Sequence, residues 1–458
     1  MRHTKFALAA MTLAVLAGCG GTDPKPGDQT IKVKYSSQVS FGDSLSDVGS
    51  YAVGTVALLK GGKFTINGDN TAVASTLTGK NWTELIAAQL GVAAPCAAVT
   101  GLDGDATKGF SVPQVAHAGC YGYAQGGSRV TNPVGPGNKL TGNPLGALTI
   151  PVVTQIANHL KAVGGKFKGD EMVFVMAGGN DALFLLTKLG DDATAAGTAA
   201  GGAAYVTSLV GQLAAGATDP ASAAAAIGLA AQTEAAKPGS TQTSITMAAV
   251  GAAAIQPGNS AVASQAVWGP MTVKAGADAT AAGTKAATDF AAAHGPELVA
   301  AMTTAGNELV NLVKTQLVAN GANYVTVNNL PDVATTPKGR LLPTSTQALI
   351  NAMVSAFNGA LSTGLASESK VLIVDVFSVS HDQATNPGPY GLTNVSETAC
   401  DLNVAKNPLA SSLTCNAGNL KSGDVSHWSF ADDVHPSPFN NLLLARYVAE
   451  KLVVKGWL

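Results

Sequence analysis

The sequence predicts an α/β fold in which helices cover both faces of a central parallel sheet. Four short, unbroken apolar runs predict fully buried strands, because strands covered on both faces do not alternate polar and apolar residues. Segments with apolar residues at three- and four-residue intervals lie between these runs and predict amphipathic helices. Alternation of strands and helices favours a three-layer α/β/α domain with right-handed crossovers. The expected strands are 38–41, 172–177, 324–328 and 371–376, and the expected helices are 82–90, 151–163, 298–318, 344–361 and 438–454.

The composition excludes two classes of protein. The 458 residues include 27 basic and 29 acidic side chains, for a net charge of -2. A nucleic-acid binder needs a positive surface that displaces counterions from phosphates, so no nucleic-acid partner is expected. Hydrophobic residues make up 46% of the chain, which is enough for a large core and excludes general disorder.

The first residues predict an export signal. A basic segment at 1–5 precedes an apolar run at 6–16, which has about the length of a signal-peptide core. The sequence LAGC that ends at Cys19 resembles a bacterial lipobox, whose cysteine is acylated; a plain secretory signal is the alternative. The resemblance implies a signal peptide at 1–18, a lipidated Cys19 with a tether through residue 36, and attachment to outer-membrane lipid or the cell surface of a Gram-negative cell.

The four remaining cysteines predict disulfides. An exported protein enters an oxidising compartment in which disulfides persist. Four cysteines allow three connectivities. We favour the sequence-local pairs Cys96–Cys120 and Cys400–Cys415, since each would hold one loop-rich segment, and free buried thiols are the alternative.

Residues 191–294 interrupt the alternation of strands and helices. Ala, Gly, Thr and Ser dominate this segment, and its glycines together with Pro220, Pro238 and Pro257 are expected to divide it into short helices and loops that lie over the domain. The α/β domain would then comprise 37–190 and 295–458. Because the insertion follows a central strand, one hypothesis makes it a mobile cap beside the site, and the other makes it a surface decoration.

Two blocks at opposite ends of the chain predict a nucleophilic serine and its base. Ser44 lies in FGDSLSDVG, directly after the first expected strand, at the edge where open α/β sheets place their sites. His435 follows Asp432 by three residues, which lets the carboxylate hold Nδ1 of the ring and leaves Nε2 for Ser44. The pair Asp424 and His427 has the same spacing but no following proline and helix, and is the alternative base.

The other titratable side chains are expected to be structural or exposed. Asp433 is expected to be a solvated neighbour of Asp432. Four further histidines have no carboxylate in a matching setting and are expected at the surface or in structural roles; they are His117, His159, His294 and His381.

These blocks resemble those of the GDSL, or SGNH, serine hydrolases, especially their bacterial lipase and esterase branch. A glycine block, GYAQGGSR at 122–129, and a Gly-Gly-Asn-Asp block at 178–181 follow in the family's order. Gly122 stands where relatives usually have Asn, which affects the expected support of that loop. Asp181 is expected to cap the helix that follows it.

The resemblance implies a role for each matched residue. Ser44 would be the nucleophile, His435 the base and Asp432 the residue that orients it. The oxyanion hole would consist of the backbone N–H groups of Ser44 and Gly127 and the side-chain amide of Asn180.

The resemblance also implies a flavodoxin-like SGNH fold and a reaction. The expected activity is hydrolysis of a carboxylic ester with an acyl chain, through an acyl-enzyme on Ser44, with no metal or organic cofactor. A polysaccharide O-acetylesterase of the same fold is the alternative enzyme. A non-catalytic surface lipoprotein that binds or scaffolds is the alternative from another class.

Overall fold

A four-stranded parallel sheet organises the chain, which the computed structural model describes at residues 33–68 and 78–458. The strands follow the spatial order β1 (Ser37–Gly42), β4 (Glu171–Met176), β5 (Tyr324–Asn328) and β6 (Val371–Val374), and every neighbouring pair is parallel. They lie where the unbroken apolar runs predicted strands, so the expected α/β fold with a parallel sheet is confirmed. The expected signal peptide and Cys19 lie outside the described residues.

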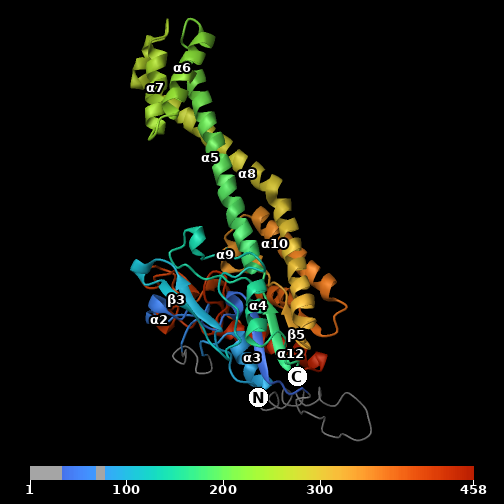
Figure 1. Ribbon diagram of the computed structural model, residues 1–458. Coiled ribbons are helices and arrows are strands. Elements are labelled where there is room, and N and C mark those ends of the chain that lie inside the picture. The colour runs from blue at the N-terminus through green and yellow to red at the C-terminus, as the bar shows by residue number, and fades with distance from the viewer. Residues whose placement is uncertain (1–32, 69–77) are drawn as a thin grey trace, which may run out of the picture.

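Helices cover both faces of the sheet (Figure 1). On one face lie α4 (Val152–Ala162), the C-terminal part of α8 (Gln265–Leu312) and α10 (Thr344–Leu365). On the other face lie α3 (Trp82–Leu90) and α12 (Pro438–Lys455). The α/β domain therefore has three layers, with one hydrophobic core on each side of the sheet.

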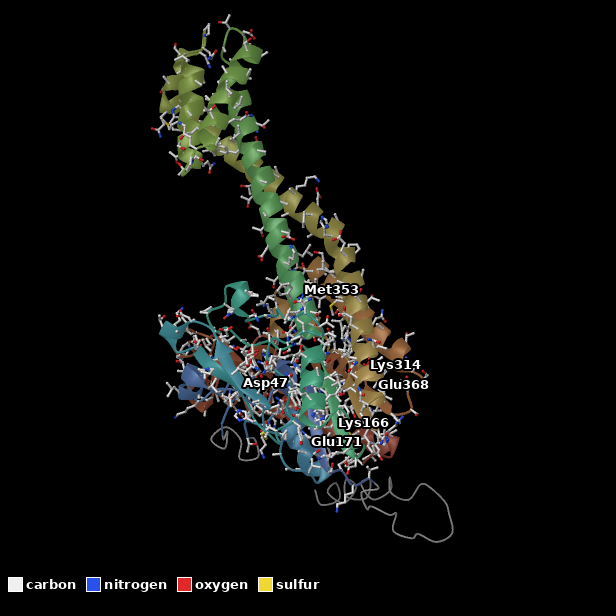
Figure 2. The ribbon with its side chains drawn as sticks, viewed as in Figure 1. Asp47, Lys166, Glu171, Lys314, Met353 and Glu368 are labelled. Atoms are coloured by element: carbon white, nitrogen blue, oxygen red, sulfur yellow. A yellow bond between two sulfur atoms is a disulfide. The ribbon has the colours of Figure 1, made fainter. Side chains whose placement is uncertain are left out.

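The side chains of β4 show why the strands have unbroken apolar sequences. Val173 and Val175 are buried in the core with α10, whose Met353 lies inside that layer (Figure 2). The alternate residues point to the opposite face, where the ring of Phe174 meets Trp82 of α3 edge to face at 5.0 Å between centroids. Successive side chains of a strand point to opposite faces, so β4, with both faces covered, buries apolar residues at 172–176. The covered strands β1 and β5 also bury polar side chains, namely Gln38, Ser40, Thr326 and Asn328.

Shorter elements connect the three layers. Three of them are the short helices α2 (Gly54–Leu58), α9 (Pro337–Arg340) and α11 (Val376–Thr385), which have 5, 4 and 10 residues. Two small sheets pair β2 (Val99–Asp103) with β3 (Ser111–Ala116) and β7 (Asn394–Thr398) with β8 (Trp428–Phe430). Single turns are η1 (Ser44–Ser46), η2 (Ala106–Lys108), η3 (Lys139–Thr141), η4 (Ser260–Ala263), η6 (Val333–Thr335), η7 (Gly388–Tyr390), η8 (Ser412–Thr414) and η9 (Ala417–Asn419), and the π-helical η5 (Val313–Val318) extends α8.

The Ala-rich segment forms a long arm, so the expectation of short helices lying over the domain is wrong. The helix α5 (Gly179–Ala214) runs away from the sheet, and α8 returns beside it (Figure 1). At the far end of this arm lie α6 (Pro220–Ala235) and α7 (Gln242–Ala254). With a rise of 1.5 Å per residue, the 36 residues of α5 span roughly 54 Å. The far end therefore does not cover the sheet edge, contrary to the cap hypothesis.

Close contact between helices explains why glycine does not break the arm. A Cβ atom at Gly197 would lie 2.8 Å from the carbonyl oxygen of Gly283, and one at Gly283 would lie 2.9 Å from that of Gly197. These glycines let the backbones of α5 and α8 touch, while the surrounding alanines favour helix. Pro220, Pro238 and Pro257 do separate helices, because Pro220 begins α6 and the other two lie in the turns that follow α6 and α7. Pro270 lies inside α8.

One histidine is buried in the aromatic core beneath α4. The ring of His159 is fully buried and contacts four aromatic rings at centroid distances of 4.8–5.8 Å. Within the described part of the chain, neither ring nitrogen has a hydrogen-bond partner. Burial, with a smaller contribution from Lys168, lowers the pKa of His159 from 6.5 to about 4. The contacting rings are Phe41, Tyr121, Tyr123 and Phe167.

We predict that His159 makes the fold sensitive to acid. As the pH falls through 6.5 towards 4, the unfolded chain takes up a proton at His159 before the folded chain does, so stability is lost across that window. Between pH 7 and pH 4.5 the loss from this group is about 2 kcal/mol. Urea unfolding at the two pH values should show a smaller loss in His159→Phe than in the wild type. The exposed His117→Phe serves as the control, and equal losses in all three proteins would contradict the prediction.

Candidate active site

The end of β1 places Ser44 at the carboxyl edge of the sheet. Gly42, the last residue of β1, has φ +150°, and a Cβ atom there would collide with the carbonyl oxygen of Met176 on β4. Only glycine therefore fits this position. The chain then turns into η1, of which Ser44 is the first residue, and the carboxylate of Asp43 accepts the Leu45 N–H at 3.1 Å.

A chain of hydrogen bonds joins Ser44 to residues near the other end of the sequence. Ser44 Oγ lies 2.9 Å from His435 Nε2. On the other side of the ring, His435 Nδ1 lies 2.8 Å and 3.0 Å from the two carboxylate oxygens of Asp432. When Nδ1 carries the proton, the ring donates to Asp432 and accepts the hydroxyl proton of Ser44 at Nε2. The structure thus brings together all three residues that the sequence blocks predicted as neighbours.

Backbone N–H groups hold the Asp432 carboxylate in place. One oxygen accepts from the N–H groups of Val434 at 3.1 Å and His435 at 2.9 Å, and the other accepts from Ser412 at 2.7 Å. Burial alone raises the pKa of Asp432, but the facing His435 and these hydrogen bonds outweigh it and hold the pKa well below its usual range. The carboxylate is therefore charged at neutral pH and fixes the orientation of the His435 ring.

Both expected disulfides are present, and each holds a segment next to these residues. Cys400–Cys415 closes the segment that carries Ser412, and the Cys400 N–H donates to the carbonyl oxygen of Ala431 at 2.9 Å. Cys96–Cys120 closes a loop whose Cys96 carbonyl accepts the Gly122 N–H at 3.0 Å. The two disulfides thus tether the segments on either side of the candidate site.

Gly127 and Asn180 lie in the same pocket as Ser44. This catalytic pocket has a volume of about 300 Å³, and its lining includes Ser44, Gly127, Asn180 and His435. Asn180 stands in the first turn of α5 and donates one Nδ2 hydrogen to the Ser128 carbonyl at 2.9 Å. Because a side-chain amide has two N–H hydrogens, the second remains for a ligand in the pocket. The structure therefore places Gly127 and Asn180 in the pocket that also holds the Ser44 hydroxyl.

Two buried carboxylates support the site, and sequence reasoning assigned them no role. Asp47 (Figure 2) accepts the N–H groups of Gly49 at 2.8 Å and Gly126 at 2.9 Å, which links the Ser44 block to the glycine block. Burial raises the pKa of Asp43 to about 7, although the Leu45 N–H and the nearby His435 lower it. The sequence signal for such a role was the presence of Asp43 and Asp47 within a block of otherwise small and apolar residues.

Asp181 and Gly122 differ from their expected roles. Asp181 does not cap its own helix; its carboxylate accepts Arg129 Nε at 2.9 Å and the Val130 N–H at 3.1 Å. It therefore ties the loop after the glycine block to the start of α5. At Gly122 a Cβ atom would lie 2.7 Å from a methyl group of Val48, so the space that a side chain would need is already filled.

The remaining histidines lie elsewhere in the molecule. The alternative base His427 is exposed and packs edge to face against Phe439 at 4.4 Å between ring centroids. Two of the other histidines pair with a carboxylate that the D-x-x-H spacing does not reveal. His294 pairs with Glu297, one helix turn further along the chain, at 3.0 Å. His381 pairs with Asp332, which lies in a loop distant in sequence, at 2.7 Å. Asp433 is exposed. Among residues 33–68 and 78–458, no three acidic, cysteine or histidine side chains form a group suited to a metal ion.

Comparison with known proteins gives a weak and partial similarity. No family model matches the chain. Over 141 residues, or 28% of this chain, the sequence is 26% identical to the GDSL esterase/lipase APG of Arabidopsis thaliana. The chain covers 39% of the length of that relative. The similarity therefore supports at most a relation to the GDSL family and favours an ester hydrolase.

Proposed function

We propose that the protein is a serine carboxylic ester hydrolase of the GDSL type. The observation that carries this proposal is the continuous hydrogen-bonded chain from Ser44 through His435 to the buried Asp432, which opens into the catalytic pocket. The partial similarity to a GDSL esterase/lipase and the order of the four sequence blocks support it.

In the proposed acylation step, Ser44 Oγ attacks the ester carbonyl carbon and its proton passes to His435 Nε2. The charged Asp432 stabilises the imidazolium that forms. The developing oxyanion accepts hydrogen bonds from the backbone N–H groups of Ser44 and Gly127 and from the Asn180 amide. The bond to the alcohol oxygen then breaks, that oxygen takes the proton from His435, and the acyl group stays on Ser44. Water, activated by His435 in the same way, releases the carboxylic acid and restores the serine.

The lining of the catalytic pocket favours an ester with an apolar acyl chain. Beyond the polar atoms at Ser44, the lining consists largely of aliphatic side chains. Such a surface binds an alkyl chain through burial of apolar area, whereas the acetylated sugar of the alternative enzyme would need polar partners. The aliphatic residues include Leu45, Leu145, Ala147, Leu183, Leu330, Val333 and Val434.

We predict that Ser44→Ala abolishes ester hydrolysis without unfolding the protein. Loss of the nucleophile should lower kcat for p-nitrophenyl butyrate by roughly 10⁴–10⁶. Ser46→Ala is the matched control, because its hydroxyl lies in the same turn but accepts from the Trp82 indole at 3.2 Å. Initial rates and melting temperatures of the three proteins test this. More than about a tenth of the wild-type activity in Ser44→Ala would rule out Ser44 as the nucleophile, and an inactive wild type would favour the non-catalytic lipoprotein.

We further propose that the mature protein is a lipoprotein held in the outer membrane through acylated Cys19. The support is the LAGC sequence after an apolar run of signal-peptide length. Radioactive fatty acid fed to expressing cells should label the wild type and leave Cys19→Ser unlabelled, because the thiol is the attachment site. Equal labelling of both proteins would exclude Cys19 as that site.

A further inference from the structure

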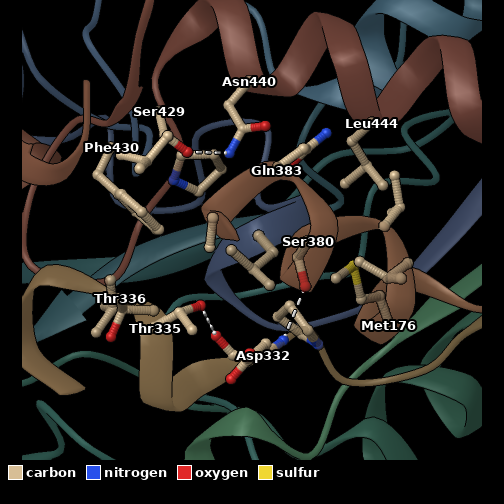
Figure 3. A pocket seen from close by; sticks show the side chains of 18 residues that line it. Met176, Asp332, Thr335, Thr336, Ser380, Gln383, Ser429, Phe430, Asn440 and Leu444 are labelled. Atoms are coloured by element: carbon tan, nitrogen blue, oxygen red, sulfur yellow. Dashed lines mark hydrogen bonds between the residues drawn. The ribbon is translucent and has the colours of Figure 1, made fainter. Parts of the chain in front are cut away.

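A second pocket adjoins the catalytic pocket, and we name it the α11 pocket. It lies between α11, the loop after β5, β8 and the start of α12, and it has a volume of about 80 Å³ (Figure 3). Four side chains line both pockets and form the boundary between them. These are Leu45, Pro331, Thr336 and Val434.

The α11 pocket presents a mainly apolar surface. Its lining includes Val379, Ala384 and Leu444. Several polar side chains around it are already paired within the protein. Asn440 Nδ2 donates to Ser429 Oγ at 2.9 Å, and Ser380 Oγ accepts the Asp332 N–H at 2.8 Å (Figure 3).

Further polar groups at the border of the pocket are also occupied. Thr335 Oγ1 donates to the Asp332 carbonyl at 2.9 Å, and Thr336 Oγ1 donates to the Val333 carbonyl at 2.8 Å. The protons of these hydroxyl groups are therefore engaged, although Asp332 Oδ1 and the Gln383 amide also border the pocket. A hydrocarbon entering here would remove the largely apolar lining from water. The pocket therefore suits an alkyl group better than a carbohydrate.

The position of the α11 pocket relative to Ser44 indicates which part of an ester would reach it. Val434 precedes His435 in the chain and Leu45 follows Ser44, so the boundary lies beside the serine–histidine pair. Ser44, His435 and the proposed oxyanion donors Gly127 and Asn180 all line only the catalytic pocket, so the α11 pocket adjoins the serine–histidine pair across Leu45 and Val434. The alcohol oxygen must lie next to His435 Nε2, because that nitrogen returns the proton when the ester bond breaks.

From this geometry we propose that the α11 pocket binds the alcohol part of the substrate, an apolar alkyl alcohol. This inference rests on the proposed ester hydrolysis. The acyl chain would then lie in the larger catalytic pocket, against Leu145 and Leu183. The preferred substrate is therefore an ester with two apolar parts, and the α11 pocket sets the preference for the alcohol.

Ala384→Phe tests the proposal because its ring would fill the α11 pocket from one side. The substrates are the butyrate esters of methanol, ethanol, butanol and hexanol, which share one acyl-enzyme. For the wild type, kcat/KM should rise about fourfold for each methylene buried, until the pocket is full. In Ala384→Phe this rise should disappear, while methyl butyrate is hydrolysed within about twofold of the wild-type rate. Thr385→Phe, at an exposed neighbouring position of α11 outside the pocket lining, should retain the rise.

Product inhibition gives a second measurement that needs no variant. Aliphatic alcohols should inhibit ester hydrolysis by the wild type, with an inhibition constant that falls about fourfold per methylene. An alcohol series unchanged by Ala384→Phe would overturn the proposal, as would inhibition independent of alcohol length. If Ala384→Phe instead alters a series of methyl esters of longer acids, the α11 pocket holds the acyl chain and the proposal is wrong. Failure of the wild type to hydrolyse any ester would refute the proposed function itself, which is a distinct result.

Discussion

The buried carboxylate of Asp432 is the interaction on which the candidate site depends. A buried charge is costly unless hydrogen bonds and an opposite charge compensate it, and here three backbone N–H groups and the His435 ring do so. This requirement brings Ser412, in the segment closed by Cys400–Cys415, into contact with the turn that carries His435. The resulting ring orientation points Nε2 at Ser44. The electrostatics of one carboxylate therefore fix the geometry of the hydrogen-bonded series from Asp432 through His435 to Ser44.

Ser44 itself depends on the parallel sheet. β1 ends beside Met176 of β4 with glycine at the position where a Cβ atom would collide with the Met176 carbonyl oxygen, and the carboxylate of Asp47 then anchors the glycine block to the same turn. Since β4 leads directly into α5, Asn180 reaches the pocket from the neighbouring strand. The same helix continues far beyond the domain, so the arm and the proposed oxyanion donor belong to one helix.

The sequence predicted what depends on local pattern and missed what depends on distant contacts. Runs without polar–apolar alternation identified the four strands, because burial on both faces removes that alternation, and the Ser44 and His435 blocks identified residues that do lie together. The arm was missed because contact between Gly197 and Gly283 decides whether glycine breaks or joins those helices. The pairing of Asp181 with Arg129 also joins separate segments, and no local spacing reveals it.

The most direct test of the account is the rate at which a fluorophosphonate modifies Ser44, followed by mass spectrometry of the intact protein and of its peptides. Because this reagent reacts with activated serine, the account predicts one adduct per chain on the peptide that contains Ser44. His435→Ala should slow the reaction by at least about 10³, and His427→Ala should leave it unchanged within about twofold. An unmodified Ser44 in the wild type, or slowing by His427→Ala instead of His435→Ala, would contradict the proposed relay.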